Sequence, residues 1–453
     1  MNMVLTKLAW RNLRRNIRRS IATGMAIAAG FTAFMIAAGY AFRVERVLGA
    51  YTQYALHVGH MGIYKKKALE MYSLKPSQFS LTVDEQKAVE EALAQISNIE
   101  MSGKYLVGQG LMGNGCKTFP FVADGVDLRI ESRVKNHPNL LAWNPHITTL
   151  REGDPIWTVP LEIGPVAISE GLAKLLGKTK LHRDVAGNKT VLVTDCAAPD
   201  AKELIASDAN VQLASGTWDG TLSALDGEFV MRFTTGLVET NNTTVVLPIE
   251  RLQMLLNTDH IMNFSVWLKE PLFLLPTLDK LRDKLKKTAP ELEVLPWTDE
   301  RLSPYYSGTM HFIYVMVGFV GFVLALVVIL SIFNSATMTA IERSQEVGMF
   351  RSVGYNQKTI RKLFILEGLF LTVASVFAGA ILGLLTMWTI NKLDITIHPP
   401  GVAGGISLMF APNALIIITG AIFVGVLGML STWLAVASIV KKNIANLVSG
   451  AAR

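Results

Sequence analysis

The chain has 453 residues, of which 50% are hydrophobic and only 17% are charged. Soluble domains carry about 25% charged residues, so this composition and a mean hydropathy of +0.35 indicate a membrane protein. The net charge of +7 does not indicate nucleic-acid binding, because six basic residues cluster before the first hydrophobic run. This cluster contains no acid, which is typical of the cytoplasmic side of a membrane helix. Its members are Lys7, Arg11, Arg14, Arg15, Arg18 and Arg19.

Residues 1–19 predict a cytoplasmic amphipathic helix. At about 100° per residue, one side collects apolar residues, namely Leu5, Ala9, Trp10, Leu13 and Ile17. Such a helix is expected to lie in the membrane interface with its arginines at lipid phosphates. These arginines are Arg11, Arg14, Arg15, Arg18 and Arg19. A signal peptide is the other interpretation, but residues 20–42 exceed its apolar region of roughly 7–15 residues and predict the first transmembrane helix.

Residues 43–306 contain no hydrophobic run of membrane length and are expected to form a periplasmic domain. Alternating stretches such as FPFVADGV, TTVVLPI and NFSVWLKE predict strands. DEQKAVEEALAQI and LDKLRDKLKK predict helices, so an α+β domain is expected. Cys116 and Cys196 both lie in this segment. The sequence leaves open whether they form one disulfide or remain two buried thiols.

Three further runs predict transmembrane helices at 311–334, 363–389 and 413–440. They leave a periplasmic loop at 390–412 and a cytoplasmic tail at 441–453. The predicted fold is therefore an α-helical membrane protein with four transmembrane helices plus an inserted α+β periplasmic domain. Both termini are expected to be cytoplasmic. Gly379 and Gly383 have the spacing of close helix packing, although glycine is also tolerated without such packing.

Small residues at three- to four-residue steps in the first two spans predict a contact between two copies of the chain. These residues are Ala26, Gly30, Gly318, Gly321 and Ala325. Leu326 and Val328 are expected to face lipid instead. The spans contain no central row of charges of the kind that proton-coupled pumps use. They are therefore interpreted as struts that transmit force, without a path for a solute.

Residues 335–362, between the second and third spans, predict a charged helical segment. Gly354 suits a left-handed C-terminal cap. Glu342, Arg343, Glu346 and Arg351 are spaced so that several of them share one exposed face. A helix of this kind on the membrane surface is suited to binding a soluble partner protein. An ordinary loop with local ion pairs is the other interpretation.

The stretch ERSQEVGMFRSVG, followed by IRKLFILEGLFL, resembles the coupling segment of FtsX/MacB-type ABC transporter permeases. The family pattern E-R-x-x-E-[IV]-G-x-x-[RK]-[AS]-x-G, with a later glutamate, is filled at every fixed position. The resemblance implies that this segment docks into a separate ATPase and transmits its closure. The coupling residues would be Glu342, Arg343, Glu346, Gly348, Arg351, Gly354 and Glu367. The start LAWRNLRRNIRRS is also similar to that of the family.

The segment 43–306 is similar to the periplasmic domains of these permeases, most of all the lipoprotein-releasing LolC/LolE type. The similarity lies in stretches such as VGHMGIYKK, ADGVDLRIES and ISEGLAKLLG. By analogy, a subdomain near 127–225 is inserted into this domain. The resemblance implies a permease of the bacterial inner membrane that transmits ATPase motion and releases lipoproteins or other amphiphiles. The alternatives are an efflux permease with an adaptor and an outer-membrane channel, and a signal transmitter that activates a cell-wall hydrolase.

The resemblance implies several partners: a cytoplasmic ABC ATPase dimer, a second copy or a related permease, membrane lipids, and a periplasmic adaptor or lipoprotein carrier. ATP and Mg would bind the ATPase, and neither a cofactor nor nucleic acid is expected in this chain. No enzymatic activity is expected either, because Gly177-Lys178-Thr179 lacks the glycine at position 172 that a phosphate loop needs. No metal site is expected, because His57 and His60 are interpreted as surface histidines.

Overall fold

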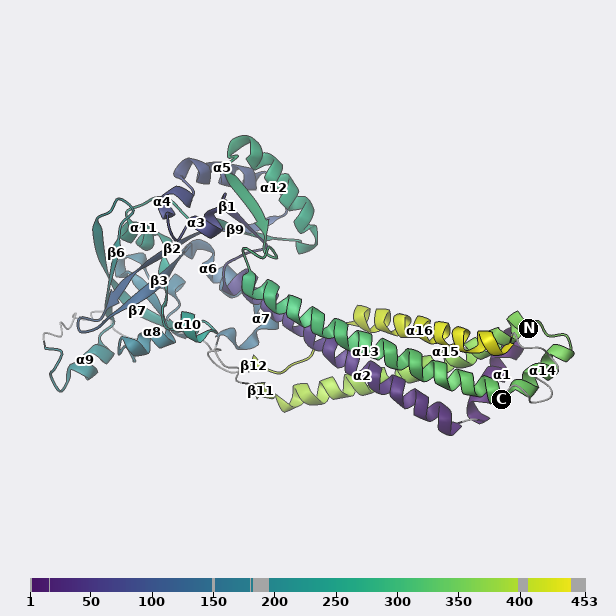
Figure 1. Ribbon diagram of the computed structural model, residues 1–453. Helices are drawn as coiled ribbons and strands as arrows, with labels where there is room; N and C mark the ends of the chain where they lie inside the picture. The colour runs from purple at the N-terminus through teal and green to yellow at the C-terminus, as the bar shows by residue number, and fades with distance from the viewer. Residues whose placement is uncertain are drawn as a thin grey trace. The chain divides into compact units, whose positions relative to one another are not determined.

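The computed structural model describes residues 2–15, 17–148, 151–179, 181, 195–397 and 406–440 (Figure 1). The chain divides into two compact units. The first, the helix unit, comprises Met1–Glu45, Thr309–Thr396 and Ser407–Arg453. The second, the sheet unit, comprises Arg46–Gly308 and Ile397–Ile406.

The helix unit contains the long helices of the chain. Its described helices are α1 (Asn2–Arg15), α2 (Ile17–Ala50), α13 (Pro304–Glu342), α14 (Ser344–Ser352), α15 (Gln357–Leu393) and α16 (Ala414–Val440). Two short strands follow α15, β11 (Thr396–Ile397) and β12 (Ile406–Ser407). Hydrophobicity locates the apolar part of a helix but not its ends, so α13 begins before and ends beyond the expected 311–334.

Four segments are long and apolar enough to cross a membrane. They are Ile17–Ala55, Pro304–Glu342, Gln357–Leu393 and Ala414–Ala437. The first of them joins α2 to the π-helix η1 (Tyr51–Ala55). The prediction of four membrane helices is therefore confirmed, and the protein is a membrane protein.

α2, α13, α15 and α16 pack side by side around a common apolar core (Figure 1). A Cβ on Gly379 of α15 would lie 2.6 Å from the carbonyl oxygen of Ala28 in α2. The hydroxyl of Thr32 donates to the carbonyl oxygen of Gly379 at 3.0 Å. Gly383 faces Met35 of α2 in the same way. The close packing predicted at these two glycines is therefore confirmed, as a contact within one chain.

The prediction that Val328 faces lipid is wrong. Val328 is 0% exposed within the core of the helix unit, whereas Leu326 is 43% exposed. Residues two positions apart on a helix point about 200° apart, so these two side chains cannot share one environment.

The sheet unit is built on a ten-stranded sheet. Its strands are β1 (Met61–Lys65), β2 (Ile99–Gly113), β3 (Thr118–Val126), β4 (Arg151–Gly153), β5 (Pro165–Ser169), β6 (Asn210–Gly216), β7 (Leu222–Phe233), β8 (Thr244–Pro248), β9 (Asn263–Leu268) and β10 (Leu292–Pro296). Their order is β10-β1-β9-β2-β3-β8-β5-β7-β4, and β6 pairs with β2 and β7. β3 and β8 are parallel, as are β5 and β7, and the other pairs are antiparallel.

Short helices complete the sheet unit. The α-helices are α3 (Ala68–Met71), α4 (Pro76–Phe79), α5 (Val83–Ala94), α6 (Leu128–Lys135), α7 (Pro138–Trp143), α8 (Glu170–Leu175), α9 (Ala201–Ser207), α10 (Val238–Asn241), α11 (Ile249–Leu256) and α12 (Leu274–Thr288). The 3-10 helices are η2 (Pro145–Thr148), η3 (Ile156–Thr158), η4 (Leu161–Ile163) and η5 (Pro271–Phe273).

The long central strand β2 shows that the sheet is covered on both faces. Its residues Leu106 and Met112 belong to the large core that includes α5, α11 and α12. Met101 and Tyr105 belong to a second core, formed with η1, α6 and α7. Successive side chains of a strand point to opposite faces. The two cores therefore lie on the two sides of the sheet.

Polar side chains fix where several helices begin. Thr82 and Glu85 form a capping box at the start of α5. Asn356 accepts from the backbone N–H of Lys358 at the start of α15. The turn between α14 and α15 contains Gly354 with φ +97°, a conformation that favours glycine. The left-handed cap predicted at Gly354 is therefore confirmed.

The predicted strands and helices are present as β3, β8, β9, α5 and α12, which confirms the α+β class. Cys116 and Cys196 form a disulfide, so the alternative of two free thiols is wrong. The described residues near 127–225 all fall within the sheet unit. An inserted subdomain there stays a prediction.

The prediction that His57 and His60 are surface histidines is also wrong. His60 is 2% exposed, and its Nδ1 accepts from the backbone N–H of Leu268 at 3.0 Å. Nε2 of His57 lies 3.0 Å from the carboxylate of the buried Glu131. The reason is that both residues lie in the connection between η1 and β1, where His60 packs beside β9 and His57 beside α6.

Candidate coupling site

A break in the helix places Arg343 inside the protein. α13 ends at Glu342 and α14 begins at Ser344, with Arg343 between them at φ −100° and ψ 16°. The side chain of Arg343 is 8% exposed, whereas that of Glu342 is 55% exposed. The expectation of one shared exposed face is therefore wrong for Arg343. It assumed one continuous helix, and the break changes the direction of the side chains.

Arg343 joins two carboxylates from different helices. Its Nη1 donates to both carboxylate oxygens of Glu367 in α15, at 2.9 and 3.1 Å. Its Nε donates to Oε2 of Glu346 in α14, at 2.7 Å. The guanidinium carbon lies 5.3 Å from the ring centre of Phe364, also in α15, which adds a cation–π contact. Because a guanidinium binds in fixed directions, these contacts fix the start of α14 against α15.

The charges of this cluster stabilise one another. Burial alone would lower the pKa of Arg343, but the carboxylates of Glu367 and Glu346 outweigh it and raise that pKa. Burial alone would raise the pKa of Glu346, but Arg343 and Arg15 outweigh it and lower that pKa. Arg343 and Glu346 therefore remain ionised at neutral pH, and removing either charge leaves a partner without its counter-ion.

The N-terminal helix α1 contributes to the same cluster. Nδ2 of Asn12 donates to Oε1 of Glu367 at 2.6 Å. Nη2 of Arg15 donates to Oε1 of Glu346 at 2.8 Å. At the start of α2, Nη1 of Arg19 donates to Oε2 of Glu342 at 3.2 Å. α1 thus contacts both sides of the joint between α14 and α15.

The apolar side of α1 packs against α15. Ala9 is 0% exposed and forms a cluster with Leu363 of α15. Leu8, Leu366 and Phe370 pack around this pair. α1 therefore has protein contacts on its apolar side as well as through Asn12 and Arg15.

These contacts correct the expectation of a position at lipid phosphates for two of the five arginines, and for the other three it stays a prediction. Arg15 and Arg19 bind acidic side chains of the protein. Arg11 and Arg18 are exposed, and the side chain of Arg14 lies outside the described residues. An amphipathic pattern shows that one side of a helix is apolar. It does not show whether lipid or another helix covers that side.

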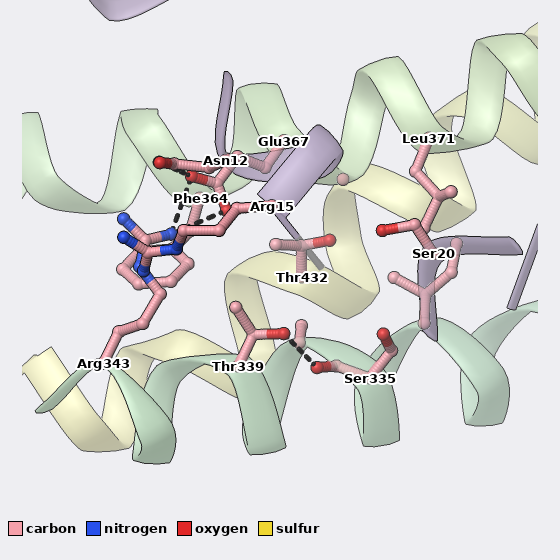
Figure 2. Close-up of a pocket in the computed structure, with 13 residues that line it drawn as sticks. Asn12, Arg15, Ser20, Ser335, Thr339, Arg343, Phe364, Glu367, Leu371 and Thr432 are labelled. Atoms are coloured by element: carbon pink, nitrogen blue, oxygen red, sulfur yellow. Dashed lines mark hydrogen bonds and ion pairs between the residues drawn. The ribbon is translucent and has the colours of Figure 1, made fainter. Parts of the chain in front are cut away.

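A small polar cavity lies beside this cluster (Figure 2). Its volume is about 50 Å³, which has room for a few water molecules. Figure 2 shows Asn12, Arg15, Arg343 and Glu367 converging at one end of it. Hydroxyl side chains line part of the rest, from Ser20, Ser335, Thr339 and Thr432, together with apolar residues such as Ile332 and Leu371. The hydroxyls of Thr339 and Thr432 donate to carbonyl oxygens of their own helices, at 2.8 and 2.9 Å. The cavity therefore lies where α1, α2, α13, α15 and α16 meet.

The other predicted coupling residues lie further along α14. Gly348 is buried within this helix. Nη1 of Arg351 donates to the carbonyl oxygen of Val440, at the end of α16, at 3.3 Å. Gly354 lies in the turn that follows. The structure therefore brings Glu342, Arg343, Glu346 and Glu367 together, and it places Arg351 and Gly354 at the far end of α14.

The small residues predicted to join two copies do not share one environment. A Cβ on Gly30 would lie 2.5 Å from Cδ1 of Leu324, so Gly30 packs against α13 of the same chain. A Cβ on Gly321 would lie 3.8 Å from Phe34 of α2. Gly318 has no neighbour within 4 Å among the described residues. Ala26 and Ala325 are half-buried. A contact between two copies through these residues stays a prediction.

Asn12 and Phe364 belong to the cluster around Arg343 but are not among the residues predicted from the sequence. Asn12 lies three residues after Ala9, on the side of α1 that is otherwise apolar. A single asparagine on an otherwise apolar helix side indicates a buried polar contact, and this signal could have identified Asn12 from the sequence. Phe364 lies one turn before Glu367 on α15, and no sequence feature separates it from the other aromatic residues of that span.

Comparison with known proteins finds sequence similarity at the C-terminal end of the chain. Residues 318–444 match the family described as FtsX-like permease C-terminal. The ABC transporter permease YtrF of Bacillus subtilis is 28% identical over 113 residues, which are 24% of this chain and 26% of YtrF. An uncharacterized ABC transporter permease of Methanocaldococcus jannaschii is 25% identical over 154 residues, 34% of this chain and 39% of that protein. The chain thus matches about a quarter to two fifths of the length of these relatives.

Among solved structures, the periplasmic region of MacB from Actinobacillus actinomycetemcomitans aligns with a TM-score of 0.31 and 9% identity. This alignment covers 52% of the present chain and 88% of the MacB region. The family match at residues 318–444 includes Arg343, Glu346 and Glu367. At the level of an FtsX-like permease C-terminal domain, the resemblance expected from the sequence is therefore confirmed for this part of the chain, whereas the narrower likeness to LolC/LolE stays a prediction.

Proposed function

We propose that this chain is the membrane subunit of an ABC transporter and passes the motion of a separate cytoplasmic ATPase to its sheet unit. The observation that carries the proposal is the buried Arg343–Glu367 pair within the segment that matches FtsX-like permeases. In this proposal ATP and Mg bind a dimeric ATPase. The chain itself is not an enzyme and works as a dimer with a second copy or a related permease.

The exposed side of α14 is the proposed docking surface. Met349 of α14 and Val353, the residue that follows α14, are 56% and 74% exposed. α14 is bonded to α15 through Arg343 and Glu367, and it follows α13 after a single non-helical residue. A displacement of α14 by the ATPase would therefore move both helices.

The interior of the spans supports mechanical transmission. The buried core that α2, α13, α15 and α16 share is mostly apolar, and hydroxyls buried within the spans donate to carbonyl oxygens of their own helices. Small glycines let α2 and α15 approach closely. Among the described residues, the polar cavity near α14 has a volume of only about 50 Å³. A solute path would need polar groups along the length of the spans.

The proposed orientation places both termini in the cytoplasm of a bacterial cell and the sheet unit in the periplasm. The basic residues on α1 and at the start of α2 favour the cytoplasmic side. The disulfide between Cys116 and Cys196 favours an oxidising compartment for the sheet unit. The inner membrane meets both requirements.

The proposed cargo is a lipoprotein or another amphiphile of the inner membrane, which a periplasmic carrier or adaptor would then accept. The resemblance of residues 43–306 to lipoprotein-releasing permeases supports this cargo class. Mechanical transmission also supports this cargo class. Extracting a lipoprotein from a bilayer surface requires mechanical work, but it requires no path for a solute through the spans.

The test is reconstitution of the chain with its co-purifying ATPase in proteoliposomes that contain a fluorescent lipoprotein. We expect release that requires ATP, is lost in Glu346→Gln and is retained in the matched exposed variant Glu239→Gln. Transport of a soluble drug that requires an adaptor would instead support efflux. ATP hydrolysis that activates a cell-wall hydrolase without release would support signalling. If no ATPase co-purifies, the proposal is wrong.

A further inference from the structure

We infer that α1 and the first turn of α2 form a clasp, a positioning element of the coupling site that holds the junction of α13 and α14 against α15. The clasp consists of Asn12, Arg15 and Arg19, which bind Glu367, Glu346 and Glu342. This inference rests on the proposed function and deepens it, because it adds the N-terminal helix to the elements that respond to the ATPase.

The clasp has a firm attachment on one side. Ala9 is fully buried against Leu363 of α15. Asn12 donates to Glu367, which is itself 9% exposed on its side chain. Apolar burial together with a buried hydrogen bond to a charged group holds two elements firmly together. α1 therefore moves with α15.

The other attachment is easily reversed. In the Arg15–Glu346 pair the side chains are 57% and 34% exposed, and in the Arg19–Glu342 pair they are 29% and 55% exposed. Ion pairs that water reaches contribute little to stability, because water solvates both charges when the pair opens. Arg343, by contrast, stays bonded to Glu367 away from solvent. A displacement of the junction of α13 and α14 would therefore open the two arginine contacts and keep the buried pair.

A helix that served only to anchor the chain to anionic lipid would use its basic residues alike. In this structure they differ: Arg15 of α1 and Arg19 of α2 bind acidic residues on the two sides of Arg343, whereas Lys7 of α1 is exposed without a partner among the described residues. Lys7 is therefore the matched control for the charge of this helix.

The first experiment is a charge exchange at Arg19 and Glu342, each of which has the other as its ion-pair partner. It uses the reconstituted complex and measures cargo released per ATP hydrolysed. Arg19→Glu and Glu342→Arg should each lower this ratio several-fold, and the double variant should return it to within about twofold of the original. Lys7→Glu should leave it unchanged. All four variants should insert into the membrane to the same extent.

If Lys7→Glu lowers the ratio as much as Arg19→Glu, and the exchange does not restore it, α1 is a lipid anchor and the clasp is wrong. If the unaltered complex shows no ATP-dependent release at all, the proposed function fails. The second experiment then decides on the clasp separately.

The second experiment needs no ATPase. A cysteine at Val347, which is 2% exposed in α14 and packs against α15, is labelled with a maleimide in the membrane-embedded chain, whose two natural cysteines are bonded to each other. Adding Arg15→Glu and Arg19→Glu should speed labelling of Val347→Cys several-fold, because α14 is then held less firmly against α15, and adding Lys7→Glu should not. Equal rates in all three backgrounds would overturn the clasp.

Discussion

Nη1 of Arg343 donates to both carboxylate oxygens of Glu367, at 2.9 and 3.1 Å, across 24 residues of sequence. Neither side chain is more than 9% exposed. The pair joins the junction of α13 and α14 to α15, and Glu346 and Asn12 occupy positions around it. Removing one member of a buried pair is costly, because the other charge then has neither partner nor water.

Glu367→Gln should therefore destabilise the protein, by roughly 3–5 kcal/mol. The measurement is thermal unfolding of the full chain in detergent, with the exposed Glu342→Gln as the control, for which we expect a loss below about 1 kcal/mol. Replacing both partners, as Arg343→Met with Glu367→Leu, should recover much of the stability but not the coupling to ATP. Equal midpoints for Glu367→Gln and Glu342→Gln would contradict the role of this pair.

The sheet unit should lose stability at acid pH through Glu131. This side chain is 1% exposed and lies 3.0 Å from His57 and 3.7 Å from Lys135. Burial alone would raise its pKa, but His57 and Lys135 outweigh burial and lower the pKa from 4.5 to about 2. A lowered pKa means that the ionised carboxylate stabilises the fold above about pH 4.5. That contribution is lost as the pH falls toward 2.

Urea unfolding of the full chain between pH 5 and pH 2, followed by tryptophan fluorescence, checks this expectation. The free energy of unfolding should fall by about 3 kcal/mol over this window through Glu131. Glu131→Gln should remove that part of the slope, whereas the exposed Glu239→Gln should keep it. An unchanged slope in Glu131→Gln would show that other groups carry the acid sensitivity.

Loss of the disulfide should destabilise the sheet unit. The bond between Cys116 and Cys196 closes a loop with a sequence separation of 80, and breaking such a bond costs roughly 2–5 kcal/mol. Cys116→Ser together with Cys196→Ser should lower the urea midpoint, and a reductant should then have no further effect on the variant. Two free thiols in protein purified from membranes without reductant would contradict the bond.

Two glycine substitutions separate packing within the chain from contact between copies. Gly379→Leu should prevent stable folding, because even a Cβ added at this position would lie 2.6 Å from the backbone oxygen of Ala28. Gly318→Leu should fold, because the described residues leave space around it. If Gly318 contacts a second copy, as predicted, the leucine variant should shift from dimer to monomer in native mass spectrometry. A dimer that survives this change would remove Gly318 from the contact.

Hydrophobic runs and basic clusters predicted the four spans, because these signals are local in sequence. The burial of the Arg343 side chain was not predictable. Its direction depends on a one-residue break in the helix and on a partner 24 residues away in the sequence. α1 was recognised as amphipathic, but whether lipid or Leu363 of α15 covers its apolar side depends on tertiary structure. The burial of His60 likewise follows from its packing beside β9. Periodicity identifies the faces of an element, and only the fold decides what covers them.

The most direct test of the account is a chemical cross-link from α14 to the ATPase. Single cysteines at the exposed positions Val353 in the α14 turn and Leu272 in the sheet unit are treated with a short thiol-to-amine cross-linker in native membranes. The account predicts that Val353→Cys yields a product containing an ABC ATPase, that its amount changes when ATP is bound, and that Leu272→Cys yields none. An ATPase product from Leu272→Cys, or none from Val353→Cys in a complex that hydrolyses ATP, would contradict coupling through α14.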